Sequence, residues 1–304
     1  MLFHQYIFVP AVRPTTQAIG FMLLSMVAFA AMNIVIRHIG DSLHSTQMVF
    51  VRNVISLFLV TCVAAMMQRA IRRFRTDRLT GHAGRAMAGL LAMQLWFYSV
   101  TIMPVTFATA LSFTTPIFAT IFAIVFLKEK AGWRRWSALA VSFGGVLLIL
   151  NPDPDALNIA VLYVLAASAA MAVAGVFVKS LSRTESPETI VFFMALFMTP
   201  ASLPFALGHW QPMDMTQLGW LFLIAFFSTS AQLMMAHAFR RTTMVMLMPL
   251  DFTRLIFTSL FAYIAFGEVL EGQAWAGAGL IVASSVYIAH REATLQRIRN
   301  QKRN

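Results

Sequence analysis

The chain has 304 residues, of which 59% are hydrophobic and only 12% are charged, and its mean hydropathy is +0.73. This composition excludes an ordinary soluble globular domain, in which about 25% of residues are charged. The formal net charge is +11, and the single cysteine, Cys62, excludes an internal disulfide.

Ten apolar stretches account for nearly the whole chain, and each is about long enough to cross ~30 Å of hydrocarbon as a helix. The sequence therefore predicts an all-α integral membrane protein with ten transmembrane helices. In chain order they lie near residues 17–38, 46–67, 86–103, 107–127, 133–150, 157–179, 189–207, 216–238, 244–266 and 273–290. No soluble domain is expected, because the longest connection, residues 68–85, is short.

The charges between the spans alternate in sign by side. If the N-terminus is cytosolic, all but three of the 23 Lys and Arg fall in cytosolic segments, including the cluster between Arg69 and Arg85 and the tail at 291–304. The outer loops are acidic instead, with Asp41, Asp153, Asp155, Asp214, Glu268 and Glu271. Because short loops rich in Lys and Arg stay inside, both termini are predicted to be cytosolic, and the net charge reflects topology rather than nucleic-acid binding.

The two halves of the chain match each other under shifts of 139 and 142 residues. The matched pairs include Glu129/Glu268, Trp136/Trp275 and Arg37/Lys179. We therefore predict two five-helix domains, residues 17–150 and 157–290, followed by a basic cytosolic tail at 291–304 that lies against anionic lipid. An odd number of spans per copy orients the copies oppositely, as in many secondary transporters that open one central site to either side in turn.

Away from the ends of the predicted spans, three charged residues lie within them: Arg52, Asp251 and Arg254. A charge at the bilayer centre costs ~2.5–3.5 kcal/mol on insertion scales, so each is expected to face protein or water and to have a partner. Asp251 and Arg254 are three residues apart and share a helical face. Two interpretations stay open: this pair neutralises itself while Arg52 bonds to backbone carbonyls, or the arginines contact substrate. Asp251 is also a candidate proton carrier.

Other polar and aromatic residues within the spans complete the candidate substrate-binding set: Asn33, Gln94, Trp96, Tyr98 and Gln232. Pro116 and Pro249 interrupt the fourth and ninth spans, and each removes a helix hydrogen bond and exposes a carbonyl. Each proline is interpreted either as a packing kink or as part of a site.

Sequence motifs for catalysis are missing, with no His-Glu-x-x-His, Gly-x-Ser-x-Gly or phosphate-binding Gly-x-x-x-x-Gly-Lys-Ser/Thr run. We therefore predict no enzyme activity, catalytic residue, metal site or cofactor. Two alternatives to a secondary transporter stay open, a lipid or polyprenyl-phosphate flippase of the same fold and a membrane-embedded enzyme.

The segment Pro104-Val105-Thr106 through Ser112-Phe113 and Pro116, running on to Glu129 and Trp136, resembles the EamA domain of the drug/metabolite transporter superfamily. The segment from Pro249 through Arg254 to Glu268 looks like a second copy. The resemblance covers almost the full length. It implies a ten-helix carrier of two repeats with a central cavity, driven by a gradient rather than by ATP.

Within that superfamily, Leu43-His44-Ser45, Phe50-x-Arg52 and the run Thr101–Thr106 look most like the S-adenosylmethionine uptake transporters and related bacterial permeases. In the ninth span, Asp251-Phe252 departs from the Tyr- and Glu-containing pattern of that branch. The resemblance therefore implies the superfamily rather than one substrate.

Two positive charges, Arg52 and Arg254, stand against one negative charge, Asp251, within the spans. The expected substrate is accordingly a small organic metabolite that bears a carboxylate or is zwitterionic, such as an amino-acid derivative or S-adenosylmethionine. The expected partners are this substrate, the lipid bilayer and a coupled proton or other ion, without nucleic acid, in a monomer or homodimer. The expected location is the inner (plasma) membrane of a bacterial-type cell, with multiple passes.

Overall fold

The structure is a computed structural model that describes most, but not all, of the chain. The described residues are 14–66, 76–115, 117–118, 121–122, 137, 140–141, 144–145, 148, 159–181, 184–241, 247, 250–251, 253–269, 271–280, 282–284 and 286–287. Throughout these ranges the backbone forms helices and turns, without a β-strand.

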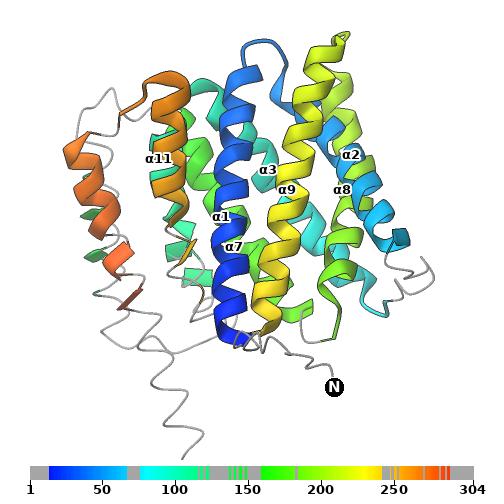
Figure 1. Cartoon of the computed structure of the whole chain (residues 1–304), viewed down its shortest axis with the longest axis horizontal. Coiled ribbons are helices and arrows are strands. Elements are labelled where there is room, and N and C mark those ends of the chain that lie inside the picture. Colours follow the sequence, from blue (N-terminus) through cyan, green and yellow to red (C-terminus); the bar gives the residue numbers. More distant parts are fainter. Residues whose placement is uncertain are drawn as a thin grey trace, which may run out of the picture.

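Long helices standing side by side make up the described part (Figure 1). They are α1 (Pro14–Ile39), α2 (Ser45–Met66), α3 (Leu79–Ile102), α4 (Val105–Ser112), α7 (Ile159–Leu181), α8 (Pro187–Leu207), α9 (Met215–Arg241) and α11 (Thr253–Phe266). Residues 272–280 are also helical. Within the described ranges, 5 helices are long and apolar enough to cross a bilayer, namely α1, α2, α7, α8 and α9.

Two predicted spans differ from the structure. Helix α3 begins at Leu79, not at residue 86, so His82 and Arg85 lie inside the helix and not in a cytosolic loop. The fourth span was expected as one helix over 107–127, but α4 ends at Ser112 and the chain turns at Phe113 and Thr114 before helix resumes. The sequence explains this turn, because Pro116 has no N–H to donate to the carbonyl of Ser112, four residues before it, and a proline ring clashes with that carbonyl in a continuous helix. Pro116 and Pro249 themselves lie outside the described residues.

Polar caps and one glycine define several helix ends. Ser186 accepts a hydrogen bond from the Thr189 N–H at the start of α8, with Pro187 in the first turn. Asp214 and Gln217 satisfy each other's backbone N–H groups at the start of α9, which is a capping box. Gly267 ends α11 with φ of 67°, and its N–H bonds to the Tyr263 carbonyl. This left-handed conformation turns the chain sharply and favours glycine.

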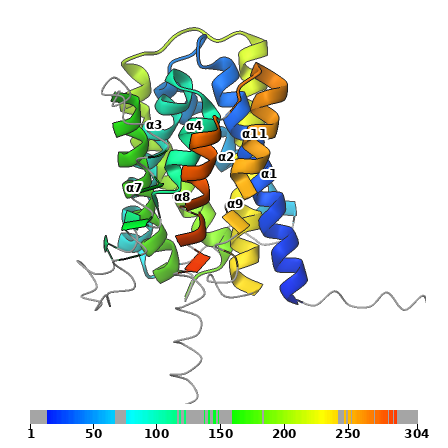
Figure 2. The ribbon, with the colours of Figure 1, turned by 90° about the vertical axis from the view of Figure 1, so that its left-hand side faces the viewer.

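The helices pack in a pattern that joins the two halves of the chain. Helix α1 packs most extensively against α9, and α3 packs most extensively against α7. Helix α2 lies against α8 and α9, while α4 contacts α7 and α11 (Figure 2). A single large cluster of buried apolar side chains runs through these contacts, including Met32, Phe97, Leu111, Val164, Met198 and Leu255.

Candidate functional site

Arg52 is one of the largest fully buried side chains, with 1% of its surface exposed. It lies on α2 seven residues after Ser45, or ~10 Å along the helix axis at ~1.5 Å per residue. Its Nε donates to Ser228 Oγ on α9 at 2.8 Å, and its Nη1 donates to Asn53 Oδ1 at 2.7 Å. These acceptors are neutral. The guanidinium of Arg52 is therefore hydrogen-bonded, but its positive charge is not balanced by a negative one among them.

Asn53 extends this contact to a third helix. Its Nδ2 donates to Ser202 Oγ on α8 at 3.4 Å, and Asn53 itself is fully buried. The buried polar residues Arg52, Asn53, Ser202 and Ser228 thus hold α2, α8 and α9 together. We call these four residues the Arg52 cluster.

Asn33 and Trp96, both predicted as candidate binding residues, contact each other directly. Trp96 Nε1 on α3 donates to Asn33 Oδ1 on α1 at 3.1 Å, and Asn33 is 1% exposed. Met93 is one turn before Trp96, and its sulfur lies 3.7 Å from Arg52 Nη1. Residues three apart share a helix face, so this face of α3 connects the Asn33–Trp96 pair to the Arg52 cluster.

Gln94 and Tyr98 lie one turn apart on another face of α3. The Tyr98 ring meets the Tyr163 ring of α7 edge to face, with centroids 5.1 Å apart. Both amide atoms of Gln94 are buried without a hydrogen-bond partner. A buried amide without partners is costly, and a bound ligand or water with complementary polar groups would satisfy it.

Arg254 belongs to a second polar group, formed by α4, α7 and α11. Its Nη2 donates to Ser112 Oγ at 3.0 Å, and its guanidinium lies 5.9 Å from the centre of the Phe113 ring. Ser168 Oγ of α7 donates to the Ser112 carbonyl at 3.5 Å. The Nε of Arg254 is buried and has no hydrogen-bond partner, so this guanidinium keeps a donor available.

Asp251 pairs with Arg254 only loosely. The distance from Arg254 Nη2 to Asp251 Oδ2 is 4.0 Å, and the two side chains are 20% and 40% exposed, respectively. The predicted sharing of one helix face is therefore confirmed, but the pair is too long and too exposed to fix Arg254 tightly. Gln232, the remaining predicted residue, is half-buried on α9 one turn after Ser228.

The predicted charged residues thus fall into two groups. Arg52, with the Asn33–Trp96 pair near it, lies among α1, α2, α3, α8 and α9, whereas Arg254 lies on α11, contacts α4 and pairs with Asp251. No hydrogen bond or ion pair joins Arg52 to Arg254 within the described residues. Sequence reasoning missed Ser112, Ser202 and Ser228, because serines in apolar spans carry no signal until the helix contacts are known.

At the upper end of Figure 1, the α1–α2 and α8–α9 connections meet. Gln47 Nε2 donates to the Gln211 carbonyl at 2.8 Å, and the Gln211 N–H donates back to Gln47 Oε1 at 3.1 Å. The rings of His44 and His209 stack with centroids 3.9 Å apart. Burial, and next to it the neighbouring His209, lower the pKa of His44 below its usual value.

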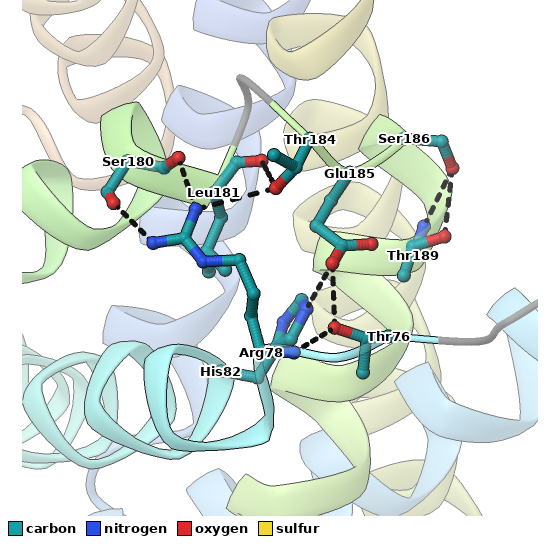
Figure 3. Close-up of polar contacts among 9 residues, drawn as sticks. All are labelled: Thr76, Arg78, His82, Ser180, Leu181, Thr184, Glu185, Ser186 and Thr189. Atoms are coloured by element: carbon teal, nitrogen blue, oxygen red, sulfur yellow. Dashed lines mark hydrogen bonds and ion pairs between the residues drawn. The ribbon is translucent and has the colours of Figure 1, made fainter.

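The opposite end holds a second set of loop contacts, which Figure 3 shows. Arg78 donates to the carbonyl and the hydroxyl of Ser180, at 2.8 and 2.7 Å. Glu185 accepts from Thr76 Oγ1 at 2.6 Å, and its Oε1 lies 3.9 Å from Nε2 of the buried His82. These contacts fasten the residues before α3, and the start of that helix, to the α7–α8 connection.

The arrangement presents hydrogen-bond donors that are suited to binding an anion. Arg52 and Arg254 donate to serine hydroxyls, and guanidinium donors of this kind recognise oxyanions. In the part of the chain that the structure describes, no three His, Cys, Asp or Glu side chains are grouped to hold a metal ion.

Comparison with known proteins agrees with a binding and transport role. A 27% identical relative, the S-adenosylmethionine uptake transporter of Rickettsia bellii (strain RML369-C), aligns over 93% of this chain and 96% of its own. The riboflavin transporter of Vibrio cholerae serotype O1 (strain ATCC 39315 / El Tor Inaba N16961) is 33% identical, over 91% of this chain and 94% of its own.

A solved crystal structure of 14% identity shares the fold, with a TM-score of 0.63 over 92% of this chain and 99% of that one. The model of the EamA-like transporter family matches twice, at residues 16–151 and 158–289. Each match covers five of the predicted spans, and together they take in nearly the whole chain. The protein is therefore a multi-pass membrane protein and belongs to the EamA-like transporter family.

Proposed function

We propose that this protein is a gradient-driven transporter of a small organic metabolite that bears a carboxylate, built from two inverted five-helix repeats. The observation that carries the substrate class is the buried Arg52, whose hydrogen-bond partners are all neutral. The helix pattern supports the repeat, and the repeat supports the alternating mechanism.

Helix bounds support the inverted repeat. A shift of 142 residues carries Ile39 onto Leu181, which are the ends of α1 and α7. The same shift carries Ser45 onto Pro187, which are the starts of α2 and α8. Two independent boundaries thus agree with the shift that pairs Arg37 with Lys179 in the sequence.

Helix packing supports the repeat in a second way. If α1 and α7 are equivalent first helices, and α3 and α9 are equivalent third helices, exchanging the copies turns the α1–α9 contact into the α7–α3 contact. These are the two most extensive contacts among the described helices. A transporter with such symmetry reverses its facing when the copies exchange conformations.

The substrate class follows from charge. An arginine buried in low dielectric is stabilised by a counter-charge, and its neutral partners here provide only hydrogen bonds. Arg254, with an available Nε and a loose carboxylate partner, presents a further donor. A substrate carboxylate would complete either group. Asn33, Trp96, Gln94, Tyr98 and Gln232 would supply stacking and neutral hydrogen bonds.

The substrates named for two relatives provide two probes, of which one carries a carboxylate and the other does not. S-adenosylmethionine carries a carboxylate, whereas riboflavin does not. We therefore expect this protein to favour the first over the second.

Reconstitution in liposomes tests the proposal. Uptake of labelled S-adenosylmethionine, labelled riboflavin and a set of labelled amino acids and organic acids is measured with and without an imposed pH gradient. Carboxylate-dependent uptake that accelerates with a gradient and needs no ATP is expected. Uptake of riboflavin alone would contradict the carboxylate, and equal rates with and without every ion gradient would contradict coupling. Protein-free liposomes and the Arg254→Met variant serve as controls.

A further inference from the structure

Arg85 is a buried arginine that the sequence placed in a cytosolic loop. It lies in the second turn of α3 and is 9% exposed. Its Nε and Nη1 atoms are buried and have no hydrogen-bond partner. No carboxylate of the described residues lies within ion-pair distance of it. An arginine in this state is unusual, because burying an unpaired charge is strongly unfavourable.

Gly89 provides the space that the Arg85 guanidinium occupies. A Cβ atom at position 89 would overlap Arg85 Nη1 and the terminal methyl of Met198, a buried residue of α8. The Arg85 side chain therefore runs along α3 toward Gly89, away from the cytosolic end of the helix. Glycine at this position keeps a place for a guanidinium between α3 and α8.

Arg52 reaches the same part of α3 from α2. Its Nη1 lies 3.7 Å from the Met93 sulfur, and Met93 is one turn after Gly89, ~6 Å along the helix axis. Because one guanidinium lies at Gly89 and the other at Met93, one turn further along α3, their positive charges are expected to repel each other. Two arginines, on different helices and at different depths, thus point toward one stretch of α3.

Positive charge is in excess where Arg52 and Arg85 approach α3. Arg52 is bonded to Asn53 and Ser228, which are neutral, and two nitrogen atoms of Arg85 have no acceptor. Like charges in a low-dielectric interior repel strongly, and neither has a carboxylate partner among the described side chains. An oxyanion between the two guanidinium groups would offset the repulsion and accept hydrogen bonds from the free N–H groups, because guanidinium binds carboxylate and phosphate through paired hydrogen bonds.

We propose that Arg52 and Arg85 form a binding site for a carboxylate or phosphate group, separate from Arg254, and that this group belongs to the transported substrate. Only the assignment of this group to the transported substrate rests on the proposed function. Asn53 and Ser228 orient Arg52, and Gly89 positions Arg85. The site selects anionic metabolites and gives no advantage to neutral ones such as riboflavin.

Binding of simple anions to the purified full-length protein tests the site directly. Inorganic phosphate and succinate are titrated at constant ionic strength against chloride, with affinity measured by calorimetry and unfolding temperature by intrinsic fluorescence. The variants are Arg52→Met, Arg85→Met, Arg85→Lys and Gly89→Ala. The control is Arg241→Met, which removes an exposed arginine at the end of α9. Because phosphate stabilises many proteins non-specifically, only differences from this control count.

Wild type and Arg241→Met should bind phosphate or succinate and unfold at a higher temperature with the anion. Arg52→Met and Arg85→Met should lose roughly tenfold or more in affinity, as expected when one of two paired charges is removed. Unliganded Arg85→Met should unfold at an equal or higher temperature than wild type, since an unpaired buried charge is gone. Gly89→Ala should weaken anion binding without a change in charge. Arg85→Lys, which keeps the charge but not the planar fork, should bind more weakly than wild type and more tightly than Arg85→Met.

Unchanged anion affinity in Arg85→Met, or a wild type that binds no better than this variant, would overturn the site. A lower unfolding temperature with wild-type affinity would show that Arg85 is structural and would overturn it too. Stabilisation that requires phosphatidylglycerol, and that phosphate and succinate do not reproduce, would assign the anion to a lipid headgroup and overturn the substrate clause. Binding is measured without a gradient, so Arg85-dependent binding in a protein that transports nothing would refute the proposed function and leave the site standing.

Discussion

Arg37 on α1 pairs with Glu268, the second residue beyond the end of α11, with 3.9 Å between Arg37 Nε and Glu268 Oε1. The same guanidinium donates from Nη1 to the carbonyl of Thr101 near the end of α3. One side chain therefore connects α1, α3 and the chain beyond α11. In the sequence repeat, Lys179 matches Arg37 and Glu129 matches Glu268. An inverted repeat would place that second pair at the opposite face of the membrane.

Substitutions at Arg37 and at the matched Lys179 should shift the balance between the states open to either side of the membrane in opposite directions. Arg37→Met should favour the state open at the face of Asp214, and Lys179→Met the state open at the opposite face. The readout is labelling of Ser112→Cys in a Cys62→Ala background by an impermeant maleimide, in right-side-out and inside-out vesicles. Because the Arg37 and Glu268 side chains are 31% and 15% exposed, stability should fall only by about 0.2–1 kcal/mol. The same direction of change in both variants would refute matched roles for the two positions.

Arg254 should tolerate neither lysine nor methionine. Lysine keeps the charge but loses the planar group that contacts Ser112 and Phe113, so transport should fall roughly tenfold while the protein folds. Methionine should abolish substrate binding. The matched control is Arg241→Met, which removes an exposed arginine outside both polar groups and should change transport little. Wild-type affinity in Arg254→Met would show that Arg254 is structural.

The stacked His44 and His209 should make the upper loop contact sensitive to acid. The pKa of His44 is lowered in the folded state, so the unfolded chain binds this proton more readily. The contribution of His44 to stability is therefore complete above its ordinary pKa of about 6.5 and is lost as the pH falls from there toward the lowered folded value. Wild-type unfolding temperature should drop over this range. The His209→Phe variant keeps a stacked ring without the second charge and should show a smaller drop.

Topology can be tested at two exposed positions. In the Cys62→Ala background, cysteine replaces Asp214 in the α8–α9 connection or Thr184 in the α7–α8 connection. The charge pattern predicts that an impermeant reagent added to intact cells labels position 214 and not position 184. Inside-out vesicles should show the reverse. Swapped labelling would refute the predicted orientation and would exchange the two faces in the facing experiment above.

The helices that the sequence predicted best are those with long uninterrupted apolar runs. The bounds of α1, α2, α7, α8 and α9 all fall within three residues of the predicted spans. Helix α3 was missed by seven residues at its start, because His82 and Arg85 look like loop residues. A charge pattern carries no information about the methionine of α8 or the glutamate of the α7–α8 connection that lie beside these two side chains.

In the candidate site, too, contacts between neighbouring residues could be predicted and contacts between distant residues could not. The Asp251–Arg254 contact could be predicted because a spacing of three residues places both on one helix face. The Trp96–Asn33 and Arg52–Ser228 bonds join residues 63 and 176 positions apart, and no local rule predicts such pairs. Sequence reasoning thus identified the polar residues but not how they are grouped, and it divided the positive charges between Arg52 and Arg254 without Arg85.

The glycine that ends α11 makes the two halves of the protein chemically unequal. A shift of 139 residues places Lys128 opposite Gly267. A non-glycine residue in the left-handed conformation of Gly267 costs roughly 1–2 kcal/mol, so glycine makes the helix end that presents Glu268 to Arg37 inexpensive. If the two copies of the inverted repeat close the protein in turn, we predict that the two closed states differ in free energy and that the resting protein prefers one of them before any substrate or ion arrives. Gly267→Ala, far from both polar groups, should alter that preference in the maleimide assay without altering substrate affinity within either state.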